Sequence, residues 1–500
     1  MNTKKLKAPG YGIILLCVIA LYIAIFSYLS VKRNLAFNSH YFDLGIMNQV
    51  AFNTSQGHFL EMTNQDLSRN TSRLAIHFDP ILALFAPFYW IWRGPEVLLV
   101  GQTIIIAFGA LATYFLGKHI TKQKAMSFIF GLSYLGYFAV QRQTLFDFHA
   151  VTLASTFLLF AIYFALVKSH KLSFVFIILS LLTKENVGLV TFLMGLYFFW
   201  FKKDRTYGLT VMAASILFFV SAVFIIIPHF RQGVHFALKY YGDFGDSPSA
   251  VILGLVKNPF RVLAIILEQD RLAYLGTLLL TYGVFIIFAP IEFLLSLPEF
   301  LINLLSASPN MRVYYFHYNA VLVPFMIFSA ISGYAYIKKR FAKKPVFTGF
   351  FVGLFCMCNM ISVYLFNPVP YGLVQNPAST YDINTTKLAA VRMWTHKLAD
   401  SNIKIATSPQ LAPFFTDHRY YYNFLFDPAA YDQGYTDDDI IKGIDNYEKA
   451  DYVIVSRSEL HEDQAILKEF HDHLQGNPKY HRIYDKNDLE VYTNDLNRHL

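Results

Sequence analysis

Long apolar segments are the feature that most constrains the fold of this chain. A helix needs about 20 largely apolar residues to span a bilayer, and the sequence offers such candidates at 11–31, 96–117, 125–141, 150–167, 187–201, 208–228, 273–290, 318–337 and 346–366. Two shorter runs, 172–183 and 291–305, bring the predicted number of spans to about eleven. Hydrophobic residues make up 55% of the chain and charged residues 15%, which excludes an ordinary soluble surface. We therefore predict a mainly α-helical, polytopic transmembrane bundle.

The balance of charge changes near residue 370. Residues 1–366 carry 29 Lys and Arg against 14 Asp and Glu, whereas residues 367–500 carry 13 against 20. Beyond this point, an apolar stripe over 387–399 predicts a helix, and apolar runs at 403–407 and 452–455 predict buried strands. These patterns indicate a small, water-soluble α/β module at the C-terminal end.

We therefore predict two domains, a transmembrane domain over 1–370 and a C-terminal α/β domain over 371–500. The first contains two long loops on the outer side, 32–95 and 229–272. Loops of this length rarely lack a role, and we expect them to cover a lipid substrate. Within the first loop, the apolar spacing over residues 44–52 predicts an amphipathic helix that lies in the membrane interface.

Short basic loops predict the orientation, because Lys and Arg are retained on the cytoplasmic side. Such loops alternate with the predicted spans at residues 4–7, 118–124, 168–171, 202–205 and 338–344. The N-terminus is then cytoplasmic, and the acidic C-terminal domain is extracytoplasmic. The three cysteines all lie within apolar runs, which excludes a disulfide framework. We expect a multi-pass protein of a plasma membrane.

Apart from the short basic loops, the polar clusters of the membrane half fall at the predicted outer ends of five helices. They comprise Asp43, His77, Asp79, Arg142, Asp147, His149, Lys184, Glu185, Arg312 and His317. Charged groups near membrane depth are costly and usually mark a site or a pathway. We therefore predict that these residues line one cavity that faces outward.

Asp43 is the candidate general base of this cavity. At the edge of a low-dielectric cavity, a carboxylate with a raised pKa can accept a proton from an acceptor hydroxyl. The alternative is a solvated carboxylate or a helix cap.

Two segments, His77–Phe78–Asp79 and Asp147–Phe148–His149, have the same spacing of imidazole and carboxylate. Each is compatible with a turn or with a metal site. Two ligands are a weak metal signal, so no metal residue and no cofactor is assigned, although a divalent cation such as Mg²⁺ or Mn²⁺ fits the residue types.

The remaining cations are candidates for phosphate binding. Lys184 and Glu185 are either an internal ion pair or a phosphate-binding lysine beside a carboxylate. Arg312 and His317 are candidates for gripping a phosphate or diphosphate head group, while the tyrosines between them fit an aromatic belt. The sequence has no catalytic-triad order, zinc signature or nucleotide-binding loop, and no basic patch that indicates nucleic acid.

Taken together, five segments resemble a prokaryotic family of membrane proteins of unknown function that is related to the GT-C glycosyltransferases. In chain order they are HYFDLGIMNQ, HFDPILALFAPFYW, FDFHA, LLTKEN and RVYYFHYNAVLVP. The resemblance covers most of residues 10–370. The combination is specific, although each segment alone is not.

The resemblance implies an integral-membrane glycosyltransferase that uses a polyprenyl-phosphate sugar donor and an acceptor on the outer face. GT-C enzymes place a catalytic Asp in the first outer loop, and Asp43 is the position that matches. Those enzymes often carry two adjacent acids, whereas Leu44 follows Asp43 here, which leaves metal use open.

Our leading hypothesis is sugar transfer to a cell-envelope acceptor, with the lipid bilayer and the lipid-linked donor as partners. Asp43 would deprotonate the acceptor, and the two His–Asp pairs and Glu185 would position substrates. Lys184, Arg142 and Arg312 would neutralise the leaving phosphate. The alternatives are a lipid or solute transporter or flippase with an outward-facing polar cavity, and a non-catalytic scaffold. A transporter would show polar residues along its whole path.

Overall fold

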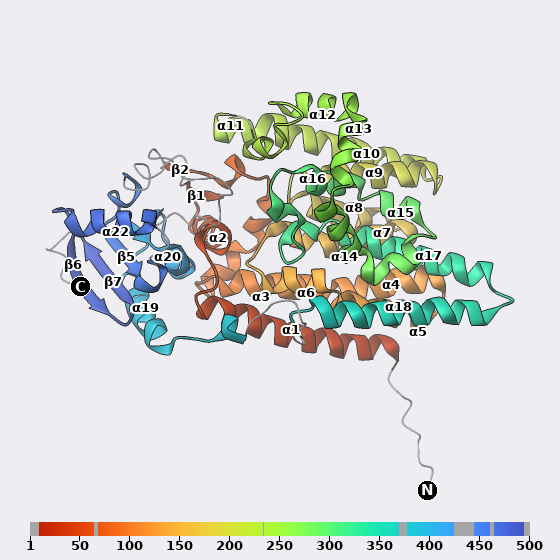
Figure 1. The fold of residues 1–500 in the computed structure, drawn as a ribbon, viewed down its shortest axis with the longest axis horizontal. Coiled ribbons are helices and arrows are strands. Elements are labelled where there is room, and N and C mark those ends of the chain that lie inside the picture. The colour runs from red at the N-terminus through yellow and green to blue at the C-terminus, as the bar shows by residue number, and fades with distance from the viewer. Residues whose placement is uncertain are drawn as a thin grey trace, which may run out of the picture.

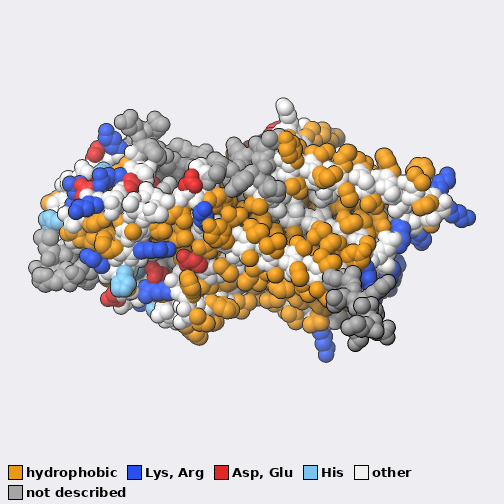
Figure 2. All heavy atoms as spheres, turned by 90° about the horizontal axis from the view of Figure 1, so that it is seen from below, with side chains coloured by type: hydrophobic (Ala, Val, Ile, Leu, Met, Phe, Trp, Pro, Cys, Tyr) orange, Lys and Arg blue, Asp and Glu red, His pale blue; other side chains and the backbone are white. Residues whose placement is uncertain are grey.

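The computed structural model describes residues 10–64, 69–233, 235–369, 378–424, 445–460 and 465–494. Figure 1 shows an elongated molecule in which long helices form a bundle and a β-sheet lies at one end. Figure 2 shows that hydrophobic side chains cover much of this face of the bundle, while charged side chains gather around the sheet and Lys and Arg cover the opposite tip.

The bundle begins with α1 (Tyr11–Leu35). Its remaining helices are α3 (Glu96–Ala107), α4 (Gly109–Thr121), α5 (Lys124–Gly136), α6 (Phe138–Leu145), α7 (Ala154–Leu166), α8 (His170–Leu181), α9 (Val187–Trp200), α10 (Arg205–Val220), α11 (Ile227–Arg231), α12 (Pro248–Lys257), α13 (Pro259–Ile266), α14 (Gln269–Ile286), α15 (Pro290–Leu294), α16 (Leu297–Leu305), α17 (Val323–Arg340) and α18 (Pro345–Phe366). The molecule is therefore mainly helical, as the apolar segments predict.

Several predicted spans are divided into shorter helices. Among the described residues, four helical stretches are long and apolar enough to cross a bilayer, namely Tyr11–Leu35, Glu96–Thr121, Arg205–Arg231 and Pro345–Phe366, and a fifth is the pair α12–α13, bent by 89°. The predicted span 125–141 is broken where Tyr137 has an extended backbone, with ψ 124°. Helix length alone does not determine the number of membrane spans, so the number of about eleven spans stays a prediction.

The segment after Asp43 differs from its prediction. A π-helical turn, η1 (Tyr41–Gly45), leads into α2 (Ile46–Ser55), and nine of the ten side chains of α2 are buried. The polar residues Asn48 and Gln49 are themselves 0% exposed. The prediction of an interfacial amphipathic helix is therefore wrong, because protein covers both the apolar and the polar face of this helix.

The C-terminal part contains a five-stranded mixed sheet in the order β4-β3-β5-β7-β6. The strands are β3 (Ile405–Thr407), β4 (Tyr421–Asn423), β5 (Tyr452–Ser456), β6 (His481–Lys486) and β7 (Leu489–Thr493), and the accompanying helices are α19 (Thr385–Lys397), α20 (Ala412–Phe415) and α22 (Ala465–Gly476). β3 pairs in parallel with β4 and β5, and β7 is antiparallel to β5 and β6.

This sheet packs against the first outer loop through a shared hydrophobic core. The rings of Tyr41 and Tyr421 stack at 5.0 Å. Gln49 Nε2 donates to the carbonyls of His418 and Arg419 at 3.3 and 3.1 Å, and Asn48 Nδ2 donates to Thr416 Oγ1 at 3.0 Å. The turn that carries Asp43 is thus held between the bundle and the sheet. The division into separate domains at 1–370 and 371–500 stays a prediction.

Candidate functional site

Asp43 lies in the π-turn directly after the first helix and pairs with a histidine from a distant segment. Its Oδ1 is 2.9 Å from His149 Nε2. The Asp43 side chain is 32% exposed and that of His149 is 11% exposed. The carboxylate therefore stands at an accessible edge, and the imidazole lies behind it.

His149 is held on both ring nitrogens and on one ring face. Its Nδ1 lies 3.0 Å from the carbonyl oxygen of Asp147, and its ring stacks on His317 at 3.6 Å between centroids, tilted by 17°. Both nitrogens face oxygen atoms, so these two contacts and the stacked ring fix the orientation of the imidazole.

The electrostatics of Asp43 differ from the sequence-based expectation. Burial raises the pKa of this carboxyl, but His149, His40 and Arg33 together outweigh burial and lower the pKa below its ordinary value. The prediction of a raised pKa is therefore wrong, because three cationic or potentially cationic groups surround the carboxylate. Asp43 is ionised, as a proton acceptor must be.

Asp147 belongs to the interior of this arrangement. It is 2% exposed and forms an ion pair with Arg33, and its other carboxylate oxygen accepts the His40 backbone N–H at 3.3 Å. Arg33 also donates to Ser39 Oγ at 3.2 Å. Asp147 therefore ties the end of α1 to the segment that carries His149, and its carboxylate is engaged by protein.

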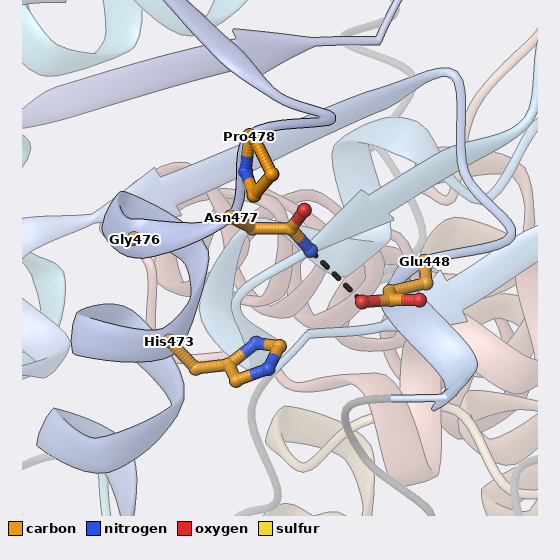
Figure 3. Close-up of a pocket in the computed structure, with 5 residues that line it drawn as sticks. All are labelled: Glu448, His473, Gly476, Asn477 and Pro478. Carbon is orange, nitrogen blue, oxygen red and sulfur yellow. Dashed lines mark hydrogen bonds between the residues drawn. The ribbon is translucent and has the colours of Figure 1, made fainter.

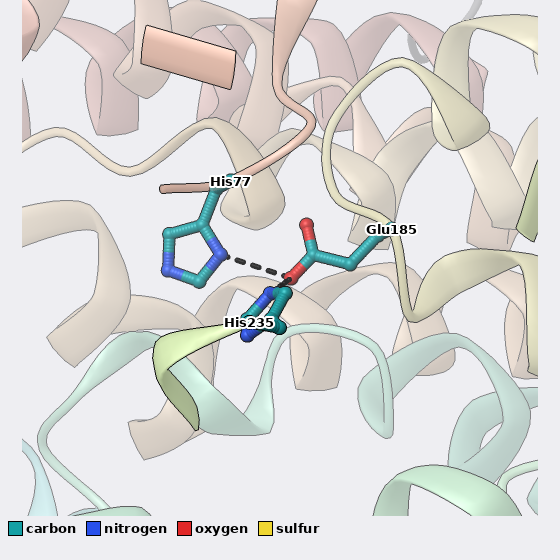
Figure 4. Close-up of side chains that lie close together, drawn as sticks. All are labelled: His77, Glu185 and His235. Carbon is teal, nitrogen blue, oxygen red and sulfur yellow. Dashed lines mark hydrogen bonds and ion pairs between the residues drawn. The ribbon is translucent and has the colours of Figure 1, made fainter. Parts of the chain in front are cut away.

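A second group is centred on Glu185. Its Oε1 lies 2.9 Å from His77 Nδ1 and 3.2 Å from His235 Nε2 (Figure 4), and its Oε2 accepts the Phe78 N–H at 3.0 Å. Burial raises the pKa of Glu185, but the two imidazoles outweigh it and hold the pKa well below its ordinary value. Burial lowers the pKa of His77 to about 3.

Asp79 turns to a different partner from His77. Its Oδ2 lies 3.0 Å from Arg73 Nε and 2.9 Å from an Arg73 terminal nitrogen. Both side chains are at most 5% exposed. This ion pair joins two positions of the loop 32–95. His77 and Asp79 therefore have different partners, and their spacing in the sequence does not bring them to a shared ligand.

Lys184 stands between the two groups. Of the two alternatives for Lys184 and Glu185, the internal ion pair does not form, because Glu185 bonds to the two imidazoles. Within the described ranges, no carboxylate oxygen lies within 4 Å of Lys184 Nζ, which sits 5.8 Å from the centre of the Tyr318 ring. Burial lowers the pKa of the adjacent His317, and His149, Lys184 and His77 lower it further. His317 thus lies within electrostatic reach of both groups.

The two predicted arginines lie apart from this centre. Arg142 is buried, donates from Nε to the Phe366 carbonyl at 2.9 Å, and packs over the Tyr314 ring at 5.3 Å. Arg312 pairs with Asp270 at 2.9 Å and donates to the Ser306 carbonyl at 2.6 Å. The structure therefore brings eight of the ten predicted residues into two neighbouring groups and leaves both arginines engaged elsewhere.

Sequence reasoning missed three residues of the centre, Arg33, Arg73 and His235. Arg33 lies just beyond the first predicted span, and Arg73 precedes His77 by four residues in the same loop. His235 lies in the second long outer loop, with no flanking pattern that sets it apart. The positions of the two arginines carried a signal, whereas His235 is brought in by tertiary packing alone.

A separate hollow of about 320 Å³ lies in the C-terminal part, lined by Glu448, His473, Gly476, Asn477 and Pro478 (Figure 3). Asn477 Nδ2 donates to Glu448 Oε1 at 2.8 Å, and His473 Nδ1 bonds to the Tyr447 hydroxyl. Its polar groups bond to one another, and it lies apart from the Asp43 centre in sequence and fold.

The fold is similar to that of a solved structure. The structure is similar to that of ArnT from Cupriavidus metallidurans bound to undecaprenyl phosphate, with a TM-score of 0.52 and 11% sequence identity over 96% of this chain and 98% of that chain. At this level of identity the similarity shows a shared fold. No curated protein matches the sequence.

The chain belongs to the family of predicted membrane proteins DUF2079, whose sequence model matches residues 33–491. The membership of a membrane-protein family that the five segments predict is therefore confirmed. Membership establishes a membrane protein with apolar helices, and leaves the reaction to be argued from the site.

Proposed function

We propose that the protein is an integral-membrane glycosyltransferase that moves a sugar from a polyprenyl-phosphate donor to an acceptor on the outer face. The observation that carries this proposal is the partly exposed Asp43 carboxylate, braced by His149. A lysine without a carboxylate partner among the described residues lies nearby. The fold adds support, since the similar ArnT structure holds undecaprenyl phosphate.

In this reaction, the acceptor hydroxyl gives its proton to Asp43 while its oxygen bonds to the anomeric carbon of the sugar. The bond between that carbon and the phosphate oxygen breaks, and polyprenyl phosphate leaves. Lys184 neutralises the leaving phosphate, because a fixed cation in a poorly solvated site stabilises developing negative charge strongly. His149, His317 and the Glu185 group position the substrates.

The proposal includes the predicted topology. The basic tip at 338–344 lies in the cytoplasm, and the C-terminal domain, 371–500, lies outside. This domain packs on the loop that carries Asp43, so it is well placed to orient a cell-envelope acceptor. Arg142 and Arg312 brace the segment before His317, Arg142 over the Tyr314 ring and Arg312 at the Ser306 carbonyl.

Turnover of purified protein tests the proposal. The full chain in lipid nanodiscs is incubated with a panel of polyprenyl-phosphate sugars and candidate acceptors, and released polyprenyl phosphate is measured. Wild type should release it, and Asp43→Asn should be slower by about 10²- to 10⁴-fold, the usual contribution of a general base. Asp246→Asn is the matched control, because Asp246 is an exposed carboxylate of the second outer loop.

The result also separates transfer from transport. Equal release by wild type and Asp43→Asn would remove Asp43 from the mechanism. Tight binding of donor lipid without release under every acceptor and metal condition, together with movement of the lipid between leaflets, would replace the transferase with a flippase.

A further inference from the structure

Three side chains of metal-binding type converge from three separate segments. His77 comes from the first outer loop, Glu185 from the connection between α8 and α9, and His235 from the start of η7 (Phe236–Tyr241) in the second outer loop. One ligand atom of each lies within 4.8 Å of the ligand atoms of the other two (Figure 4). Glu185 is 6% exposed and His235 is 8% exposed.

We propose that His77, Glu185 and His235 bind a divalent transition-metal ion, with Zn²⁺ as the preferred occupant. Two imidazoles and one carboxylate are a ligand set that suits zinc and its neighbours in the transition series. Mg²⁺ and Ca²⁺ prefer oxygen ligands alone, so this site differs from the Mg²⁺ or Mn²⁺ site considered from the sequence.

The distances fit a coordination sphere. Metal–ligand bonds of about 2.0–2.1 Å place neighbouring ligand atoms about 2.9–3.4 Å apart in octahedral or tetrahedral geometry. The Glu185 Oε1 atom is 2.9 Å from His77 Nδ1 and 3.2 Å from His235 Nε2. Two of the three distances between ligand atoms therefore already match those of a coordination sphere.

The surroundings of Glu185 favour one-oxygen coordination. The Phe78 N–H donates to Oε2 at 3.0 Å, which fixes the carboxylate and leaves Oε1 facing both imidazoles. Hydrogen bonds of this kind, from groups that do not touch the ion, orient the metal ligands. Three protein ligands leave a fourth position for water or another ligand.

Metal binding at this site requires protons to move off the two imidazole nitrogens that face Glu185. Without metal, His77 Nδ1 and His235 Nε2 can each donate a hydrogen bond to Glu185, and when these nitrogens ligate an ion their protons must move to the other ring nitrogen or to solvent. His235 Nδ1 accepts the Ala237 N–H at 3.1 Å. Coordination through Nε2 leaves the imidazole proton on Nδ1, so this bond to Ala237 must break and the 235–237 turn must rearrange.

The ion would join the first outer loop, the α8–α9 connection and the second outer loop at one point beside Lys184. Its presence does not depend on the proposed transfer reaction. A site that is loaded in a protein without transferase activity would still support this inference.

The test uses full-length protein without a polyhistidine tag, stripped with EDTA and then titrated with Zn²⁺. Metal is counted by mass spectrometry after gel filtration, and thermal unfolding is followed in parallel. We expect about one Zn²⁺ per chain and a higher Tm on loading. Glu185→Gln and His235→Ala should retain less than a tenth of the bound zinc, whereas His229→Ala, at an exposed histidine of α11, should bind as wild type does.

Two further readouts apply to wild type alone, in case a variant does not fold. Bound Co²⁺ should show the visible absorption of a nitrogen–oxygen site, and amide exchange at Ala237 should become faster on loading. Wild type that binds no stoichiometric Zn²⁺ or Co²⁺ would overturn the proposal. Equal zinc content in wild type, Glu185→Gln and His235→Ala would overturn it as well. The three residues would then be a hydrogen-bonded cluster that holds the loops together.

Discussion

The buried ion pair between Arg33 and Asp147 offers a quantitative test of how the centre is held together. The pair links the end of α1 to the segment that carries His149, with Asp147 2% and Arg33 16% exposed. Asp147→Asn removes the negative charge and leaves a guanidinium that keeps Ser39 at 3.2 Å and the Phe146 ring at 5.3 Å. We expect the free energy of unfolding to fall in this variant.

The loss of unfolding free energy in each variant depends on the contacts that the remaining member of the pair retains. Breaking a buried ion pair by removing one member costs about 3–5 kcal/mol. Asp147→Asn should lie near 3 kcal/mol, because Arg33 is partly exposed and retains two contacts. Arg33→Met should lie nearer 5 kcal/mol, because the almost fully buried carboxylate keeps, among the described residues, the His40 N–H as its one charge-stabilising donor. The double variant Arg33→Met/Asp147→Asn removes both charges and should lose less than Arg33→Met alone.

Equilibrium unfolding in mixed micelles, driven by SDS and followed by circular dichroism, measures these losses. Asp243→Asn is the control, because Asp243 and Arg261 form an ion pair that is 72% and 51% exposed, and exposed pairs contribute less than about 1 kcal/mol. The reasoning is refuted if Asp147→Asn costs no more than Asp243→Asn. It is also refuted if the losses of the two single variants simply add in the double variant.

Two further predictions concern pH and the packing of the C-terminal part. Burial and cationic neighbours lower the pKa of His317, so the folded protein resists a proton that the unfolded chain takes up. Stability should therefore fall as pH drops below about 6.5, by up to about 1.4 kcal/mol per pH unit for each such histidine. His77, whose pKa is lowered to about 3, contributes with the same sign. The lowered pKa of Asp43 reduces stability only below about pH 4. Unfolding titrations should be flatter for His317→Phe, which keeps the ring stacked on His149, and an unchanged slope would contradict this assignment. Gln49→Leu leaves the carbonyls of His418 and Arg419 without this donor, which should cost about 1–3 kcal/mol and speed tryptic cleavage of the C-terminal part. Gln56→Leu, at an exposed position of the same loop, should digest as wild type does.

The sequence located most of the elements because hydrophobic pattern acts locally. Apolar segments predicted a helical membrane bundle, and the helix 387–399 and the runs 403–407 and 452–455 correspond to α19, β3 and β5. The pattern failed where tertiary packing covers both faces of a helix. Residues 44–52 have an amphipathic spacing, yet the polar face of α2 contacts the carbonyls and hydroxyl of another part of the chain.

The polar centre shows the same division between what the sequence predicts and what tertiary packing decides. Charged residues at membrane depth are costly wherever they occur, so the sequence alone singled out Asp43, His149, Lys184 and Glu185. It could not choose their partners, because the contacts of Glu185 with His77 and His235 span 108 and 50 residues. An apolar pattern carries no information about such pairs.

The sequence by itself thus determined a helical membrane protein of this family, and the residues from which a site can be built. The tertiary structure alone decided which of them face one another. It placed His235 beside Glu185, committed Arg312 to Asp270, and set Asp43 against His149 so that its pKa falls. Local hydrophobicity selects helices one segment at a time, whereas ionisation and coordination depend on distances between groups far apart in the chain.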